Sequence, residues 1–128
     1  MLEDFYTIEI PIAEGTQAFT TAIRLNATHR IFAGHFPEQP IVPGVCILQF
    51  IKACAEKAIG KSLQYAQISQ VKYLLPIDPR TTPLLTLNCT ITPTERDYTL
   101  TAELFAGDAL AVKIKKAIMT QTSSTLSA

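Results

Sequence analysis

Residues 43–60 read PGVCILQFIKACAEKAIG, and this stretch decides the architecture of the chain. Apolar side chains cover most of the circumference of its first three turns, which is typical of a helix buried in a core. Pro43 suits the first helical position, where its missing N–H costs no hydrogen bond, and Gly60 is a natural C-terminal stop. The polar residues fall on one side at helical spacing: Gln49, Lys52 and Glu56. The stretch therefore predicts one long, buried helix.

The segments before and after this helix alternate between apolar and polar residues, the pattern of half-buried strands. Leu87, Cys89 and Ile91, for example, share one face of residues 86–92. The predicted strands are 5–10, 18–25, 65–75, 86–92, 98–105 and a final one through Leu110, Val112 and Ile114, with a hairpin turn at Ala106-Gly107-Asp108. One helix and about six strands joined by short turns predict an α+β fold, in which an antiparallel sheet wraps around the helix.

The length of 128 residues fits a single domain, which we place at 1–120, and the small polar tail at 121–128 is expected to be frayed. Eleven Lys and Arg residues balance eleven Asp and Glu residues, so the chain lacks the excess of cations that binds nucleic acid. Charge repulsion between copies adds little to the solubility of a small neutral protein and does not keep the copies apart, which favours a homo-oligomer. The longest stretch without a charged residue is 14 residues, 81–94, so no membrane span of about 20 apolar residues is expected.

The cysteines Cys46, Cys54 and Cys89 are odd in number and form no CxxC pair, which fits reduced thiols in a cytoplasmic protein. Cys46 and Cys54 lie on the predicted helix, where burial would raise the thiol pKa and leave the thiol inert. A nucleophilic Cys46/His pair is therefore a minor alternative. With two histidines and no paired cysteines, no structural zinc site is expected.

Residues 30–49, RIFAGHFPEQPIVPGVCILQ, carry the candidate chemistry. Three prolines and two glycines within residues 34–48 predict an ordered loop that leads into the helix. His35 lies at the centre of the loop, where an apolar wall would hold the imidazole neutral, as a general base requires. The free N–H groups of Gly44 and Val45 open the helix and could stabilise negative charge on a carbonyl oxygen. The pair suits removal of a proton beside a thioester carbonyl, although a lone histidine in such a loop is more often structural.

GHFPEQPIVPGV at 34–45, followed by a helix, resembles the GHFPxxPxxPGV signature of the β-hydroxyacyl-[acyl carrier protein] dehydratases, and VKYLLPID at 71–78 resembles the segment after their central helix. The resemblance implies the hot-dog fold, a long helix wrapped by an antiparallel sheet. It also implies a dimer, or a higher even oligomer, whose active sites lie at the subunit interface and use residues of both chains. His35 matches the family's catalytic histidine, and Gly44 matches the amide that receives the thioester carbonyl.

One position departs from the family's pattern. The family has Glu or Asp five residues after the glycine of PGV, whereas this chain has Gln49. An amide cannot give up or take a proton at neutral pH, so protonation of the departing hydroxyl should be weaker. Gln49 could hold the substrate hydroxyl or a water, or it could simply belong to the polar side of the helix. Glu38 could replace the acid, but its place in the loop favours the solvent side.

The resemblance implies dehydration of 3-hydroxyacyl-[acyl carrier protein] to the trans-2-enoyl thioester, in fatty-acid or related acyl-chain biosynthesis. His35 and Gln49 would be catalytic, and the oxyanion and substrate-binding residues would be Gly44, Val45, Phe36 and Pro43. No metal or cofactor is implied, because phosphopantetheine arrives attached to the carrier. Two alternatives stay open: an acyl thioesterase on the same fold, and a non-catalytic acyl- or carrier-binding subunit that lacks the acid.

The neutral total charge hides an asymmetry along the chain. Residues 1–23 carry four acids and no base, residues 24–80 carry seven bases and three acids, and residues 81–128 carry four of each. The seven bases are Arg24, Arg30, Lys52, Lys57, Lys61, Lys72 and Arg80. If they share one face, they form a positive rim that would steer an acidic carrier protein to the site.

Several other residues have simpler expected roles. His29 is expected to be an exposed loop residue. Phe32 and Val42 are expected to be core or the wall of an acyl tunnel, and we favour the wall for Phe36 only. The basic run is expected to be a solvated strand end: Lys113, Lys115 and Lys116.

Overall fold

The computed structural model describes residues 4–32 and 41–122. It contains one α-helix, one short 3-10 helix and six strands in that part of the chain. In chain order they are β1 (Tyr6–Ile8), β2 (Ala18–Leu25), η1 (Arg30–Phe32), α1 (Gly44–Ile59), β3 (Leu63–Tyr73), β4 (Leu84–Pro93), β5 (Tyr98–Ala106) and β6 (Ala109–Gln121).

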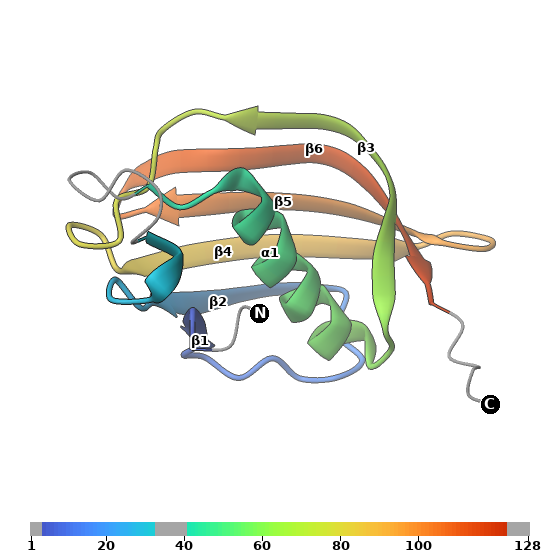
Figure 1. Ribbon diagram of the computed structural model, residues 1–128. Coiled ribbons are helices and arrows are strands. Elements are labelled where there is room, and N and C mark those ends of the chain that lie inside the picture. Colours follow the sequence, from blue (N-terminus) through green and yellow to red (C-terminus); the bar gives the residue numbers. More distant parts are fainter. Residues whose placement is uncertain (1–3, 33–40, 123–128) are drawn as a thin grey trace.

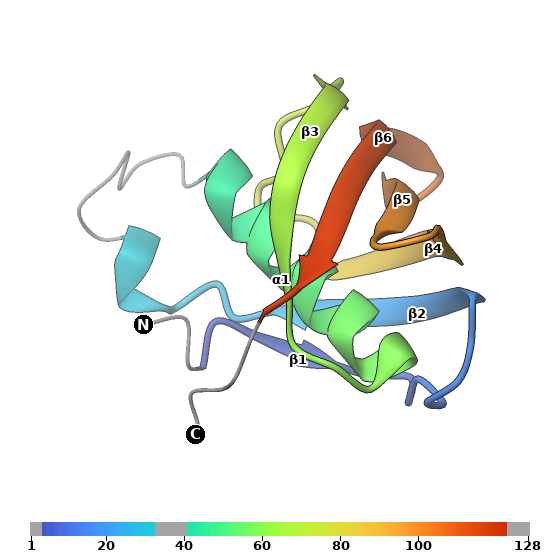
Figure 2. The ribbon, with the colours of Figure 1, turned by 90° about the vertical axis from the view of Figure 1, so that its right-hand side faces the viewer.

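The strands form one antiparallel sheet in the order β1-β2-β4-β5-β6-β3, with β1 and β3 at its edges. The sheet curves around α1, which lies across its concave face (Figures 1 and 2). This arrangement confirms the prediction of an α+β fold with an antiparallel sheet wrapped around one central helix.

The core lies between α1 and the concave face of the sheet. On β4 the residues that alternation predicted to face inward, Leu87, Cys89 and Ile91, are all buried. The buried side of α1 comprises Cys46, Ile47, Phe50, Ile51, Cys54, Ala55 and Ala58. Removing these apolar side chains from water at about 25 cal/mol per Å² is the main force that holds the helix on the sheet.

The helix begins and ends close to the predicted residues. Pro43 is the N-cap, one position before the first helical residue, with φ −63° and ψ 145°. Gly60 is the C-cap in the left-handed conformation, and its N–H donates to the Glu56 carbonyl. The expectation of a helix buried nearly all round is wrong for the single chain, because the sheet covers one side of α1 only and Val45 is 70% exposed.

The last strand is much longer than the sequence pattern indicated. Regular alternation would place buried residues of β6 two positions apart, but the buried residues Ile114 and Ala117 are three positions apart. The cause is a bulge, at which Lys115 and Lys116 both lie opposite the single residue Thr101 of β5. The lysine run therefore lies in the middle of β6, and its prediction as a strand end is wrong. Lys113 forms an ion pair with Glu103, with 3.5 Å between Nζ and Oε2.

Ordered structure also extends beyond the predicted domain end at residue 120. β6 runs to Gln121, and the N–H of Thr122 donates a hydrogen bond to the carbonyl of Ser62 at 2.9 Å. The rest of the predicted tail, 123–128, lies outside the described residues.

Candidate active site

The loop that carries the candidate base lies outside the described residues. This applies to His35, Phe36 and Glu38, so their predicted roles stay predictions. The described part of the motif begins at Ile41 and leads directly into α1.

The N-terminus of α1 presents the free amides that the sequence predicted. The N-cap, Pro43, has no side-chain hydrogen bond to the helix, and its carbonyl accepts from Cys46 N–H at 3.0 Å and Ile47 N–H at 3.2 Å. Within the described part of the chain, no group accepts a hydrogen bond from the N–H of Gly44 or Val45. Two unpaired amides backed by the dipole of a 16-residue helix can stabilise a negatively charged oxygen.

An apolar groove of about 570 Å³ opens beside these amides. The start of α1 and the segment before it form one wall, which includes Val42, Gly44, Val45 and Leu48. The end of β3 and the residues that follow it form the other wall: Tyr73, Leu74, Leu75, Pro76 and Ile77. The groove therefore places an apolar surface directly next to an anion-stabilising helix terminus.

Tyr73 and Gly44 belong to opposite walls of this groove, and the tyrosine side chain reaches Gly44. A Cβ at position 44 would lie 3.0 Å from the Tyr73 hydroxyl oxygen, 3.1 Å from Cζ and 3.3 Å from Cε1. Glycine at this position thus lets the tyrosine ring pack on the first turn of the helix. Tyr73 was not predicted as a site residue, although it is the aromatic residue of the segment VKYLLPID.

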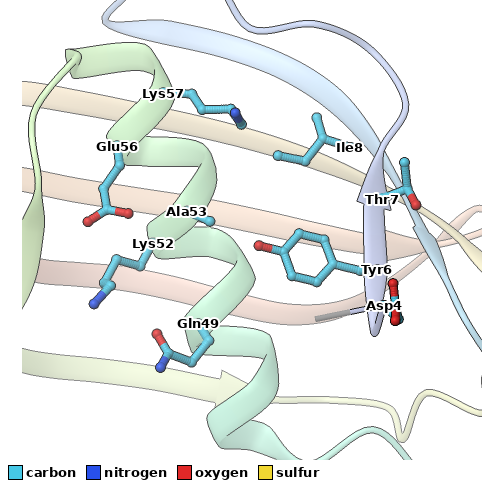
Figure 3. Close-up of a pocket in the computed structure, with 9 residues that line it drawn as sticks. All are labelled: Asp4, Tyr6, Thr7, Ile8, Gln49, Lys52, Ala53, Glu56 and Lys57. Carbon is cyan, nitrogen blue, oxygen red and sulfur yellow. The ribbon is translucent and has the colours of Figure 1, made fainter. Parts of the chain in front are cut away.

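Gln49 does not line the groove that contains Gly44. It is exposed and lines a separate, polar depression of about 700 Å³ between α1 and β1, together with Lys52, Glu56, Lys57 and Tyr6. Figure 3 shows Gln49, Lys52 and Glu56 projecting from the same side of the helix, as their spacing predicted. Within one chain the amide of Gly44 and the side chain of Gln49 therefore face different depressions.

Glu56, which lies on the same side of α1 as Gln49, already forms a hydrogen bond within the fold. Oε2 of Glu56 accepts a hydrogen bond from the backbone N–H of Leu63 at 2.8 Å, which ties the start of β3 to the helix. Glu56 lies seven positions after Gln49, so the two are about 10 Å apart along the helix axis. Glu56 is therefore poorly placed to supply the acid that Gln49 lacks.

Tyr6 extends from β1 toward the helix in the same depression (Figure 3). Burial raises the pKa of the Tyr6 phenol, and electrostatic repulsion by Cys54 and Glu56 raises it further. The phenol therefore stays protonated at neutral pH. Tyr6 was not predicted to lie here, because the contact between β1 and α1 joins segments far apart in sequence. Lys52, in contrast, lies on the predicted polar side of the helix with Gln49.

The cysteines are buried, as predicted. Burial raises the pKa of Cys54 and of Cys89 to about 12 and also raises that of Cys46. Because the thiolate is the nucleophile, these thiols are poor candidates for covalent chemistry.

Three minor predictions have mixed outcomes. Phe32 and Val42 are buried core residues, and Val42 also lines the apolar groove. His29 is half-buried rather than exposed, because η1 packs it edge-on against the Phe5 ring, with 5.4 Å between ring centroids.

The seven bases of residues 24–80 do not form one rim. Arg24 pairs with Glu9 and Arg80 with Asp78, each at 3.5 Å. Lys52 and Lys57 line the depression of Gln49.

Lys72 lies elsewhere, beside Lys115 of β6. The positive charge of Lys72 lowers the pKa of Lys115. Lys115 lines a depression on the convex face of the sheet.

The described residues contain no group of three or more His, Cys, Asp or Glu side chains placed to hold a metal ion. A helix with the length and hydropathy of a membrane span is also absent from them.

A six-stranded antiparallel sheet curved around a helix, with free amides at the start of that helix, defines a hot-dog protein. The family model described as ApeI-like, ApeI dehydratase, matches residues 12–113. The chain therefore belongs to the ApeI-like dehydratase family.

Individual relatives agree with this assignment. The chain is 36% identical to the 3-hydroxyacyl-[acyl-carrier-protein] dehydratase FabZ of Roseobacter denitrificans over 56 residues, 44% of this chain and 36% of the relative. It is 32% identical to FabZ of Allorhizobium ampelinum over 73 residues, 52% of this chain and 47% of the relative. The matches thus span less than half the length of these curated relatives.

A solved structure with the same fold is the dehydratase heterocomplex ApeI:P from Xenorhabdus doucetiae. The identity is 24% and the TM-score is 0.59, and the match covers 90% of this chain and 95% of the other. At this identity the likeness supports the fold alone.

Proposed function

We propose that the chain dehydrates 3-hydroxyacyl thioesters carried on acyl carrier protein, within fatty-acid or related acyl-chain biosynthesis. The neutral imidazole of His35 removes a proton from C2, and the charge that develops on the thioester oxygen is stabilised by the amides of Gly44 and Val45. The C3–O bond breaks, a double bond forms between C2 and C3, and the departing hydroxide takes a proton and leaves as water. The product is the trans-2-enoyl thioester.

The observation that best supports this proposal is the arrangement of amides and apolar side chains at the start of α1. In a chain of the dehydratase family, two amides without a partner among the described residues lie at the edge of an apolar groove, directly after the histidine loop in the sequence. An acyl chain needs an apolar surface, and its thioester carbonyl needs hydrogen-bond donors at the end of that surface. The groove beside Gly44 supplies both.

The position of Gln49 supports a site shared by two chains. Gln49 and Gly44 line different depressions of one chain, so Gln49 reaches a thioester at Gly44 most simply from a second copy. In that arrangement its amide holds the substrate hydroxyl, or a water, while His35 returns the proton to the departing oxygen.

The surface around the groove supports a dimer as well. β3 is an edge strand, and in the described part of the chain nothing pairs with its outer edge. Val45, Tyr73, Leu74 and Leu75 are between 42% and 70% exposed around the same groove. An unpaired strand edge beside exposed apolar side chains is the usual mark of an interface.

Incubation with 3-hydroxybutyryl carrier protein tests this function, with enoyl product and free carrier thiol measured by mass spectrometry. The proposal predicts enoyl product that disappears with His35→Ala. Free carrier thiol instead of enoyl product would favour a thioesterase. Tight carrier binding without either product, in the wild type, would favour a non-catalytic subunit that lacks the acid at Gln49.

A further inference from the structure

The hydroxyl of Tyr73 lies at the start of α1, and none of the described residues forms a hydrogen bond with it. Its oxygen is 3.0 Å from the position that a Cβ of residue 44 would take, on the side of the helix that faces the apolar groove. In the part of the chain that the structure describes, no group donates to this oxygen or accepts from it. Tyr73 is 52% exposed, so a ligand in the groove can reach it.

The contrast with Tyr65, on the same strand, indicates that this hydroxyl is not needed for folding. The hydroxyl of Tyr65 donates to the carbonyl of Leu48 at 2.9 Å and so anchors β3 to the helix. The hydroxyl of Tyr73 makes no such contact, and its ring alone is enough to form the wall of the groove. A phenylalanine would pack on Gly44 equally well.

The hydroxyl also remains a donor under ordinary conditions. Partial burial raises the pKa of the Tyr73 phenol above its usual value. The group therefore keeps its proton throughout the neutral pH range and can donate it to an acceptor beside Gly44.

We propose that the Tyr73 hydroxyl donates a hydrogen bond to the thioester oxygen, in addition to the backbone amides of Gly44 and Val45. This inference rests on the proposed function, which places that oxygen at the start of α1. The oxygen would accept from the backbone N–H groups on one side and from the phenol on the other. Donors from two separate elements, α1 and β3, fix the direction of the carbonyl and thereby the position of C2 relative to the base.

Kinetics with crotonyl pantetheine, a probe for the reverse hydration reaction, test this role. Tyr73→Phe removes one oxygen atom and keeps the ring on Gly44. We expect kcat to fall roughly 10- to 100-fold while KM changes little, since a donor to the developing charge acts mainly in the transition state. Tyr98→Phe on β5 is the matched control and should leave kcat unchanged, because Tyr98 does not line the groove.

The carbonyl stretching frequency of bound crotonyl pantetheine gives a second readout that a structural role would not change. Hydrogen bonds lower this frequency, so Tyr73→Phe should raise it toward the value in solution, whereas Tyr98→Phe should not. Equal kcat and equal frequency in wild type and Tyr73→Phe would overturn the role of Tyr73 and leave the proposed function intact. Absence of hydration by the wild type would instead overturn the proposed function itself.

Discussion

Gln49 projects from the polar side of α1 into a depression that also contains Lys52 and Glu56. Its amide can orient a hydroxyl or a water but cannot donate a proton at neutral pH. If His35 therefore carries both proton transfers, the departing hydroxyl depends on a single titrating group.

Gln49→Glu should restore a proton donor and raise the rate of dehydration at least about tenfold, since a well-placed general acid contributes about 10²–10⁴. The pH profile should change shape. The wild-type rate should rise through the pH range in which an imidazole general base loses its proton and should then stay level. The variant should also lose activity at higher pH, because its new carboxylic acid must be protonated to donate. A profile of unchanged shape and height would show that residue 49 takes no part in proton transfer.

Gly44→Ala should separate activity from stability. Position 44 does not have a positive φ, and alanine loses less backbone freedom than glycine on folding, so the free energy of unfolding should stay level or rise. The new Cβ would lie 3.0–3.3 Å from the Tyr73 ring, which is half exposed and would move away. Turnover should fall with no drop in melting temperature. A variant with normal turnover would argue against a thioester bound at Gly44.

The elements around the site are each fixed by a local signal. α1 begins after a proline that leaves two amides free and ends at a glycine with φ 78°. Its start forms the candidate site. Its end is a structural contact, because the Gly15 N–H donates a hydrogen bond there to the Ala58 carbonyl at 2.8 Å.

Gly60→Ala should lower the free energy of unfolding by about 1–2 kcal/mol, the cost of a left-handed conformation for a residue with a Cβ. That Cβ would also lie 2.5 Å from the carboxyl group of Glu14, which is the movable end of a side chain. Denaturant unfolding should therefore give a similar loss in a Glu14→Ala background. A loss that vanishes in that background would identify the clash, rather than the backbone, as its cause.

Most elements could be predicted from the sequence because their signals are local. The alternation of Leu87, Cys89 and Ile91 and the stop at Gly60 depend on neighbouring residues only. The length of β6 was missed because the bulge at Lys115 and Lys116 breaks the alternation. Helix and strand periodicity contain no information on such an insertion, which depends on pairing with β5 and β3.

At the scale of the whole molecule, contacts between distant segments determine what could be predicted of the site. The free amides of Gly44 and Val45 follow from the proline before them. The Tyr73 ring on Gly44 joins β3 to α1, and the half-buried His29 depends on Phe5 of the N-terminal segment. The burial state of these residues is decided by tertiary packing, which a single-sequence pattern does not encode.

The positions of the charged residues on the surface also depend on the fold, so bases that are neighbours in the sequence can lie on different faces. Of the seven bases in residues 24–80, Lys52 and Lys57 line the depression of Gln49, whereas Lys72 lies with the lysines of β6. An acidic carrier protein that delivers substrate to the proposed site should therefore respond to the lysines of α1.

Lys57→Glu should raise KM for 3-hydroxyacyl carrier protein roughly three- to tenfold and leave KM for the pantetheine thioester unchanged. The effect should shrink as salt is added, because exposed charges are screened. Lys116→Glu, an exposed charge reversal on β6, is the matched control. Equal effects of the two variants would exclude a docking role specific to α1.

The proposed reaction removes the C2 proton of a 3-hydroxyacyl thioester and expels its hydroxyl group. Incubation with 3-hydroxybutyryl carrier protein in D₂O, followed by mass spectrometry of the acyl group, measures both changes. We expect trans-2-enoyl product, together with deuterium at C2 of the recovered substrate because the reaction is reversible, and neither with His35→Ala. Recovered substrate without deuterium and without enoyl product, from wild-type protein that binds the carrier, would contradict the proposed reaction.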